Sequence, residues 1–278
     1  MKNFILRTLT GTVYVAVIIS GILVNQYTFL ALFSGVIIVC LWEFYGLTNK
    51  NQRFDISRVM NCLGGVALFL STFLYTTGQV TPVVFLPYLG YIVFMLVSEL
   101  YRKKEDPIHH LSIAFLGQCY IALPLSLLNV IAFPEYTEGI IRYSPLLILS
   151  LFVFIWVSDT GAYLTGMSVG KHRLFERISP KKSWEGFFGG LIFTVLSSLV
   201  FAHFESTIPY YHWMGLGIAV VVFGTWGDLI ESLMKRTLGV KDSGRSLPGH
   251  GGFLDRFDSL LLAVYGMLFY VELFKIKC

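Results

Sequence analysis

The amino-acid sequence predicts an all-α integral membrane protein, a polytopic bundle of about nine transmembrane helices whose N-terminus lies in the cytoplasm. Three observations support this fold class. Of the 278 residues, 55% are hydrophobic and only 14% are charged, whereas a soluble domain carries about 25% charged residues. Apolar segments close to the roughly 20 residues that cross a bilayer recur along the chain. Basic residues gather in every second connection between these segments.

Nine apolar segments account for most of the chain. Because hydrocarbon offers no hydrogen-bond partners, each spanning segment must be a helix or part of a closed barrel. The absence of period-two alternation favours the helix. Gly186 and Gly190 open the seventh helix with the small-residue spacing that lets two helices approach closely. The segments cover residues 8–24, 28–47, 59–77, 82–100, 111–133, 145–167, 187–204, 210–230 and 257–274.

The distribution of Lys and Arg gives the orientation. With a cytoplasmic N-terminus, one side of the membrane receives 18 of the 21 Lys and Arg residues, and the other receives Arg142, Lys275 and Lys277. The positive-inside rule assigns the basic side to the cytoplasm. A wrong number of segments would disrupt this alternation, so the charge bias supports both the count and the orientation.

Polar residues divide the chain into two parts. Residues 1–140 hold the first five helices, which we expect to be a lipid-facing scaffold that could also line a groove or a dimer contact. Residues 141–278 hold the polar clusters and are expected to carry the chemistry on the cytoplasmic side. The four cysteines show no Cys-x-x-Cys spacing, so neither a disulfide framework nor a thiolate metal site is predicted.

Two polar clusters precede the most polar stretch. Asp159 lies inside the sixth apolar segment, where a carboxylate is costly and indicates a function, or else a structural hydrogen bond to a neighbouring helix. The second cluster is the loop from Gly170 to Gly186, which contains Ser179, Lys181 and Lys182 just before a helix expected to begin near Trp184. Lysines and hydroxyls at a helix N-terminus suit phosphate binding, although a basic loop can also serve only as a topology signal or a lipid contact.

The third cluster runs from Gly227 to Ser259 and interleaves carboxylates with basic residues. Asp255 and Asp258 are three residues apart where the ninth helix begins. Carboxylates from two helices beside phosphate-binding residues suit Mg²⁺, which prefers oxygen ligands and shares substrate phosphates. Glycines around His250 allow close backbone approach to an anion, and His250 itself could contact phosphate, bind metal or cap a turn. The residues near the end of the eighth segment that share one helical face are Asp228, Glu231, Ser232 and Lys235.

The order of these residues resembles the signature of the CDP-diacylglycerol synthases, also called phosphatidate cytidylyltransferases. The matching pattern is Ser232-x-x-Lys235-Arg236, then Lys241-Asp242, then Pro248-Gly249-His250-Gly251-Gly252-x-x-Asp255-Arg256-x-Asp258. The segments Ser158–Tyr163 and Ser179–Gly186 also resemble the family. The first 140 residues resemble it only in being apolar helices.

The resemblance implies that CTP and phosphatidate react to CDP-diacylglycerol and pyrophosphate with Mg²⁺, and less firmly with a second cation such as K⁺. It makes Asp228, Asp255 and Asp258 the metal-site carboxylates. Lys235 and Arg236 complete the expected catalytic set. The expected substrate-binding residues are Asp159, Ser179, Lys181, Lys182, Ser232, Lys241, His250, Gly251, Gly252 and Arg256. The expected location is a bacterial inner membrane, with the membrane lipid as a partner, a homodimer left open and no nucleic acid involved.

The residues fit this chemistry without a strong general base. A phosphate oxygen of the lipid would attack the α-phosphorus of CTP, and that phosphate is mostly ionised near neutral pH because its second pKa is about 6. Positioning and charge neutralisation would then supply the catalysis. Two other hypotheses remain: a CTP-dependent transferase or kinase acting on a polyprenyl or archaeal lipid, and an ion-coupled transporter with Asp159 on the ion path. Charges collected at one face disfavour the transporter.

Overall fold

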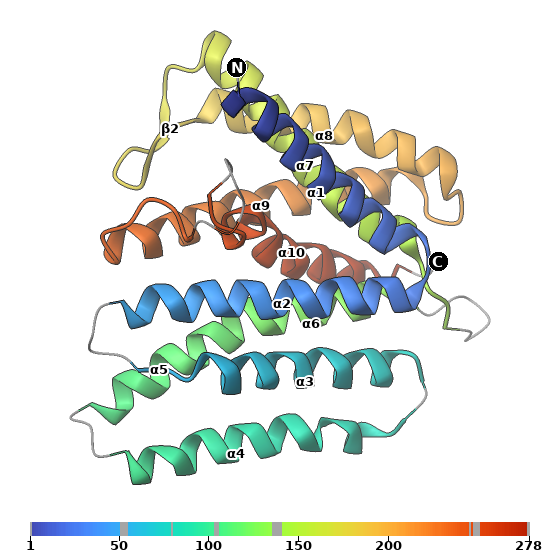
Figure 1. The fold of residues 1–278 in the computed structure, drawn as a ribbon. Helices are drawn as coiled ribbons and strands as arrows, with labels where there is room; N and C mark the ends of the chain where they lie inside the picture. Colours follow the sequence, from blue (N-terminus) through green and yellow to red (C-terminus); the bar gives the residue numbers. More distant parts are fainter. Residues whose placement is uncertain are drawn as a thin grey trace. The chain divides into compact units, whose positions relative to one another are not determined.

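The computed structural model describes residues 2–50, 55–78, 80–102, 106–134, 141–244, 246 and 251–276, with side chains from residue 8 onward. It confirms the helical membrane bundle, since each of the nine predicted segments coincides with a helical segment (Figure 1). The helices are α1 (Lys2–Leu23), α2 (Gln26–Asn49), α3 (Arg58–Thr76), α4 (Leu86–Tyr101), α5 (Pro107–Gly117), α6 (Leu123–Ala132), α7 (Pro145–Val169), α8 (Trp184–Phe204), α9 (Tyr210–Thr237) and α10 (Asp258–Phe274). Short helical turns are η1 (Pro82–Phe85), η2 (Gln118–Ala122) and η3 (Leu254–Arg256).

Among the described residues, seven helical segments are long and apolar enough to cross a membrane. They include α5 and α6 as one segment, Pro107–Ala132, joined through the π-helical turn η2. Two further helices are shorter: the described apolar part of α1 covers Thr8–Leu23, and α10 has 17 residues. The predicted fifth segment therefore matches one continuous span rather than two helices.

The loop expected between the sixth and seventh helices contains a small β-hairpin instead. Strand β1 (Arg173–Phe175) pairs antiparallel with β2 (Ser179–Ser183), so the lysines expected at a helix N-terminus lie on a strand. Helix α8 begins at Trp184, as predicted, because the Ser183 side chain caps it by accepting from the Gly186 backbone N–H. The hairpin fixes the direction of the basic residues more firmly than an open loop would.

The chain forms two compact units, which we describe separately. The first consists of Met1–Phe133 together with Asp242–Arg256. In this unit α2 packs against α1, α3 and η3, and its side from Phe29 to Thr48 is largely buried. The Asn25 side chain caps α2 in a capping box with Thr28, which explains why the turn after α1 ends where it does.

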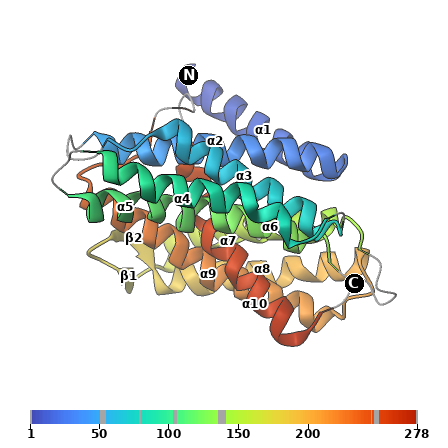
Figure 2. The same ribbon diagram turned by 90° about the horizontal axis from the view of Figure 1, so that it is seen from below.

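The second unit consists of Pro134–Lys241 together with Phe257–Cys278. Helices α7 and α8 pack side by side, and so do α9 and α10 (Figure 2). Gly190 lies so close to α7 that an added Cβ would stand 2.6 Å from the Ser158 carbonyl oxygen, and one at Gly186 would stand 2.9 Å from that of Ala162. The close approach predicted from the Gly186 and Gly190 spacing is therefore present.

Contacts within each unit agree with the predicted alternation of loops. In the first unit, Arg102 after α4 forms an ion pair with Asp55 before α3 at 3.3 Å. In the second, Lys182 of the hairpin contacts Asp228 in the C-terminal half of α9. In each unit, segments predicted to lie on the same side of the membrane are therefore in contact. The assignment of that side to the cytoplasm stays a prediction.

Candidate active site

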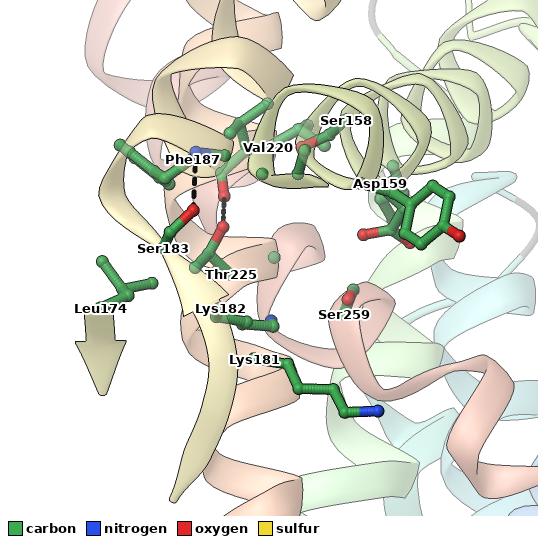
Figure 3. Close-up of a pocket in the computed structure, with 17 residues that line it drawn as sticks. Ser158, Asp159, Leu174, Lys181, Lys182, Ser183, Phe187, Val220, Thr225 and Ser259 are labelled. Carbon is green, nitrogen blue, oxygen red and sulfur yellow. Dashed lines mark hydrogen bonds between the residues drawn. The ribbon is translucent and has the colours of Figure 1, made fainter. Parts of the chain in front are cut away.

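A cavity of about 240 Å³ lies within the second unit, between the hairpin and helices α7 to α10 (Figure 3). One part of its wall is apolar, with Ile155, Leu174, Phe187 and Val220 among the lining residues. Lys181 and Lys182 extend from β2 in the direction of Ser259 of α10 (Figure 3). The polar residues that line the cavity are Ser158, Asp159, Lys181, Lys182, Ser183, Thr225 and Ser259.

An ion pair joins the hairpin to α9 beside this cavity. The Lys182 ammonium contacts the Asp228 carboxylate, and the Ser232 hydroxyl donates to the other Asp228 oxygen at 3.1 Å. The Lys182 and Asp228 side chains are only 29% and 27% exposed, so the pair is partly shielded from solvent. A partly shielded lysine held by a carboxylate is suited to exchange that carboxylate for a substrate phosphate.

The carboxylate of Asp258 belongs to the same cluster. It lies at the start of α10, accepts from the Ser259 backbone N–H at 2.6 Å, and is within electrostatic reach of Asp228, Asp159 and Lys235. Gly227 makes this arrangement sterically feasible, because an added Cβ would stand 2.5 Å from the Asp258 carbonyl oxygen. Close approach of α9 and α10 thus places carboxylates from two helices near one another, where a cation would relieve their repulsion.

The described residues contain no group of three or more His, Cys, Asp or Glu side chains that could hold a metal ion by themselves. A pair of carboxylates is nevertheless enough for Mg²⁺, which is often held by one or two carboxylates together with substrate phosphates and waters. Asp228 and Asp258 provide such a pair, so the residues present fit the ion.

On α9, Lys235 lies one helical turn beyond Glu231 and two turns beyond Asp228. It forms an ion pair with Glu231 at 3.3 Å, and the Lys235 side chain is 13% exposed while that of Glu231 is 2% exposed. Glu231 and Lys235 therefore share one face of α9, as predicted, and the Glu231 carboxylate pairs with the Lys235 ammonium. The sequence placed Glu231 on this face but gave it no role.

Glu185 orients the hairpin that carries the two lysines. Its carboxylate accepts from the backbone N–H groups of Lys171 and His172 and lies 2.6 Å from the His172 ring Nδ1. These contacts connect the residues just before β1 to the first turn of α8. Ser183 connects the end of β2 to the same turn. The lysines are thus held from both ends of the hairpin.

The loop that carries most of the sequence signature belongs to the first unit. There the Asp255 carboxylate accepts from the backbone N–H groups of Ser243 and Gly252, both at 3.0 Å. Gly251 has a φ of +85°, a conformation that favours glycine. The carboxylate of Glu43, on α2, accepts from the Ser243 hydroxyl at 3.1 Å, the Leu254 backbone N–H at 2.9 Å and the Ser246 hydroxyl.

The sequence analysis did not single out Glu43. It is a carboxylate inside a predicted transmembrane segment, the same signal that drew attention to Asp159. No signature residue lies near Glu43 in the sequence. Its partners are some 200 positions further along the chain, so only the tertiary structure reveals them.

Comparison with known proteins identifies the family of this chain. The family model described as the cytidylyltransferase family matches residues 5–274. The chain therefore belongs to the cytidylyltransferase family. It is 34% identical over 261 residues to the phosphatidate cytidylyltransferase of Staphylococcus epidermidis, covering 93% of this chain and 95% of that protein. It is 34% identical over 264 residues to that of Staphylococcus aureus and 31% identical over 284 residues to that of Haemophilus influenzae, with the same coverage.

In this cytidylyltransferase family member, the predicted site residues fall into three groups. One group lies together in the second unit: Asp159, Lys181, Lys182, Asp228, Ser232, Lys235 and Asp258. Three more residues of that unit are placed apart from the cavity lining: Ser179 pairs with Phe175 in the hairpin, Arg236 approaches the Val240 carbonyl at 3.4 Å, and Lys241 is exposed. The first unit holds Gly251, Gly252, Asp255 and Arg256, and His250 lies outside the described residues.

Proposed function

We propose that this protein is a CTP:phosphatidate cytidylyltransferase, which transfers CMP from CTP to phosphatidate and releases CDP-diacylglycerol and pyrophosphate. The observation that carries the proposal is the Asp228 and Asp258 pair, with Lys182 bound to Asp228, beside a cavity with an apolar wall. Carboxylates that can share a cation with phosphates, and a lysine that can bind a phosphate directly, are what a nucleotidyl transfer requires. The named relatives support the choice of lipid acceptor.

The reaction needs positioning more than proton transfer. An oxygen of the lipid phosphate forms a bond to the α-phosphorus of CTP, the bond from that phosphorus to the bridging oxygen breaks, and pyrophosphate takes the electron pair. Because the attacking phosphate is already mostly ionised at neutral pH, with a second pKa of about 6, no side chain has to remove a proton. Lys182 would leave Asp228 to neutralise a phosphate, while Glu231 keeps Lys235 directed along α9.

We propose Mg²⁺ as the cofactor, held by Asp228 and Asp258. When bound, it would neutralise phosphate charge and orient the reacting oxygens. Ser232 would keep the Asp228 carboxylate in place through its hydrogen bond. A third metal-site carboxylate at Asp255 and a second cation such as K⁺ stay predictions that rest on the family resemblance.

The substrates also fit a membrane-embedded site. Apolar residues on one part of the cavity wall match the glycerol and acyl end of a lipid, while the lysines and Ser259 match its phosphate. We propose a bacterial inner membrane with this site on the cytoplasmic side, because CTP is made in the cytoplasm and the basic loops favour that side. A homodimer and the absence of a nucleic-acid partner stay predictions.

CTP labelled at the α-phosphate tests the proposal directly. Purified protein in detergent should move the label into lipid when phosphatidate and Mg²⁺ are present and should not do so with EDTA. Asp255→Asn should remove this activity while the protein still folds and inserts. Transfer of the label to polyprenyl phosphate but not to phosphatidate would mean that the lipid acceptor is a polyprenyl phosphate. If the folded protein does not bind CTP, the proposed activity is wrong.

A further inference from the structure

The signature loop, residues Asp242–Arg256, is held by a side chain far from it in sequence. The Glu43 carboxylate, on the second-last turn of α2, is buried with 7% exposure. Its Oε2 accepts from both the Leu254 backbone N–H and the Ser243 hydroxyl, and its Oε1 accepts from the Ser246 hydroxyl. These three donors come from both ends of the loop, so one carboxylate connects the described residues at its two ends.

The fit around Glu43 is tight. An added Cβ at Gly244 would stand 2.6 Å from Glu43 Oε1. One at Gly252 would stand 2.5 Å from the Gly244 backbone nitrogen and would overlap the Ser243 hydroxyl. Both glycines are therefore required for the loop to close over the carboxylate. Turn η3 packs against α2 at the same place.

A second set of hydrogen bonds connects the residues bound by Glu43 to Asp255. Ser243, whose hydroxyl donates to Glu43, gives its backbone N–H to Asp255. Leu254, whose backbone N–H donates to Glu43, precedes Asp255 directly in the chain. The position of the Asp255 carboxylate is thus set through two residues that Glu43 holds.

We propose that Glu43 is a positioning residue for the transfer reaction, acting through the signature loop and Asp255 rather than by touching a substrate. This inference rests on the proposed function, since it assigns Glu43 a role in that same reaction. The role depends on geometry: Glu43 must present acceptors at a fixed distance to Leu254 and Ser243. It does not depend on the negative charge.

Substitutions at Glu43 separate geometry from charge. In Glu43→Gln the amide oxygen can take the place of Oε2 and accept both bonds, while the amide nitrogen donates to the Ser246 hydroxyl, which can also accept. In Glu43→Asp the charge remains, but the carboxylate withdraws by roughly 1.5 Å, one C–C bond length. A positioning role therefore predicts that Gln is tolerated and Asp is not.

The experiment measures kcat and KM of the full-length protein in detergent, with thermal unfolding as the check on folding. Glu43→Gln should stay within about threefold of wild type, whereas Glu43→Asp and Glu43→Ala should lose about 100-fold in kcat, the effect of a displacement near 1 Å. KM for CTP should change less than kcat. The matched control is Glu99→Gln, a carboxylate of the same unit with 7% side-chain exposure that pairs with His110 and not with the loop; it should leave kcat unchanged.

Amide hydrogen exchange of the loop tests the anchor without any activity. Peptides containing Leu254 and Ser243 should exchange about tenfold faster in Glu43→Ala and Glu43→Asp than in wild type or Glu43→Gln. Ser243→Ala, a milder change, should show the same direction if Glu43→Ala does not fold.

Two results would overturn the inference. Unchanged loop exchange in Glu43→Ala or Ser243→Ala would show that Glu43 does not hold the loop. An active Glu43→Asp beside an inactive Glu43→Gln would show that Glu43 acts by its charge. If wild type itself transfers no CMP, the proposed function fails, and the exchange measurement still decides whether Glu43 anchors the loop.

Discussion

Asp228 and Asp258 in the second unit and Glu43 in the first unit are carboxylates with different kinds of partners. In the second unit, Asp228 and Asp258 are near one another, Asp228 pairs with the Lys182 ammonium, and Asp258 is within electrostatic reach of Lys235. In the first unit, Glu43 accepts from two hydroxyls and one backbone N–H in the contacts described above. A lysine can leave a carboxylate and bind a phosphate, whereas a backbone N–H cannot leave without unfolding its loop.

This difference separates a reacting site from a supporting one. Partly exposed charges beside a cavity can be rearranged by a substrate, so they are suited to bind phosphates and a cation. Neutral donors packed around a buried carboxylate are suited to hold one backbone conformation. The comparison predicts that removing the charge of Asp228 is costly in the second unit, whereas at Glu43 in the first unit a change of shape is costly and a loss of charge is not.

The largest effect is expected when charge is removed from the second unit. Asp228→Asn should lower kcat by roughly 100- to 1,000-fold, comparable to the loss of one electrostatic group at a reacting centre. If Mg²⁺ is the proposed cofactor, saturating Mg²⁺ should raise the unfolding temperature of wild type by several degrees, a stabilisation of about 2.7 kcal/mol at 100 times Kd, and Asp228→Asn should abolish this rise. Glu176→Gln, on the exposed tip of the hairpin, is the control. An Asp228→Asn variant as active as Glu43→Gln would remove the contrast between the units.

The next largest effect concerns the lysine that pairs with Asp228. Lys182→Met should lower kcat/KM by roughly 10- to 100-fold, because a charge-assisted hydrogen bond is worth about 1.5–3 kcal/mol. Radiolabel transfer from CTP at varied phosphatidate concentrations measures it. Lys171→Met removes an exposed lysine from the same loop and should be near normal. Equal losses in the two variants would mean that the hairpin supplies only general positive charge.

Shape in the first unit is tested at Gly252. Gly252→Ala places a methyl group against the Ser243 hydroxyl and the Gly244 nitrogen, so we expect a loss of about tenfold or more in kcat without any change of charge, because small displacements at such sites are costly. Gly35→Ala, on α2 with nothing within 4 Å of the added Cβ, should be neutral or slightly stabilising. Wild-type kinetics for Gly252→Ala would show that the loop tolerates more movement than its packing implies.

The smallest effect is expected at the contact between α7 and α8. An added methyl group at Gly190 meets the Ser158 carbonyl oxygen at 2.6 Å, so Gly190→Ala should destabilise the fold by about 1–3 kcal/mol and shift Ser158 and Asp159 slightly. Thermal unfolding and kcat measured on one preparation would report both effects. Gly90→Ala, where the added Cβ meets nothing within 4 Å, is the control. A normal unfolding temperature for Gly190→Ala would mean that the two helices separate easily.

The sequence by itself determined the helices, because each apolar run of about 20 residues has no other stable form in a bilayer. It also determined which side chains share a helix face, since Asp228, Ser232 and Lys235 are related by local spacing alone, and the order of the signature residues indicated the family. Only the tertiary structure decided that Lys181 and Lys182 lie on a β-hairpin, since no residue spacing in the sequence predicts the strand pairing or the Glu185 contacts. It also decided that Glu43 accepts hydrogen bonds from Ser243 and Leu254, because a contact between positions about 200 apart depends on how distant segments pack and not on local propensity.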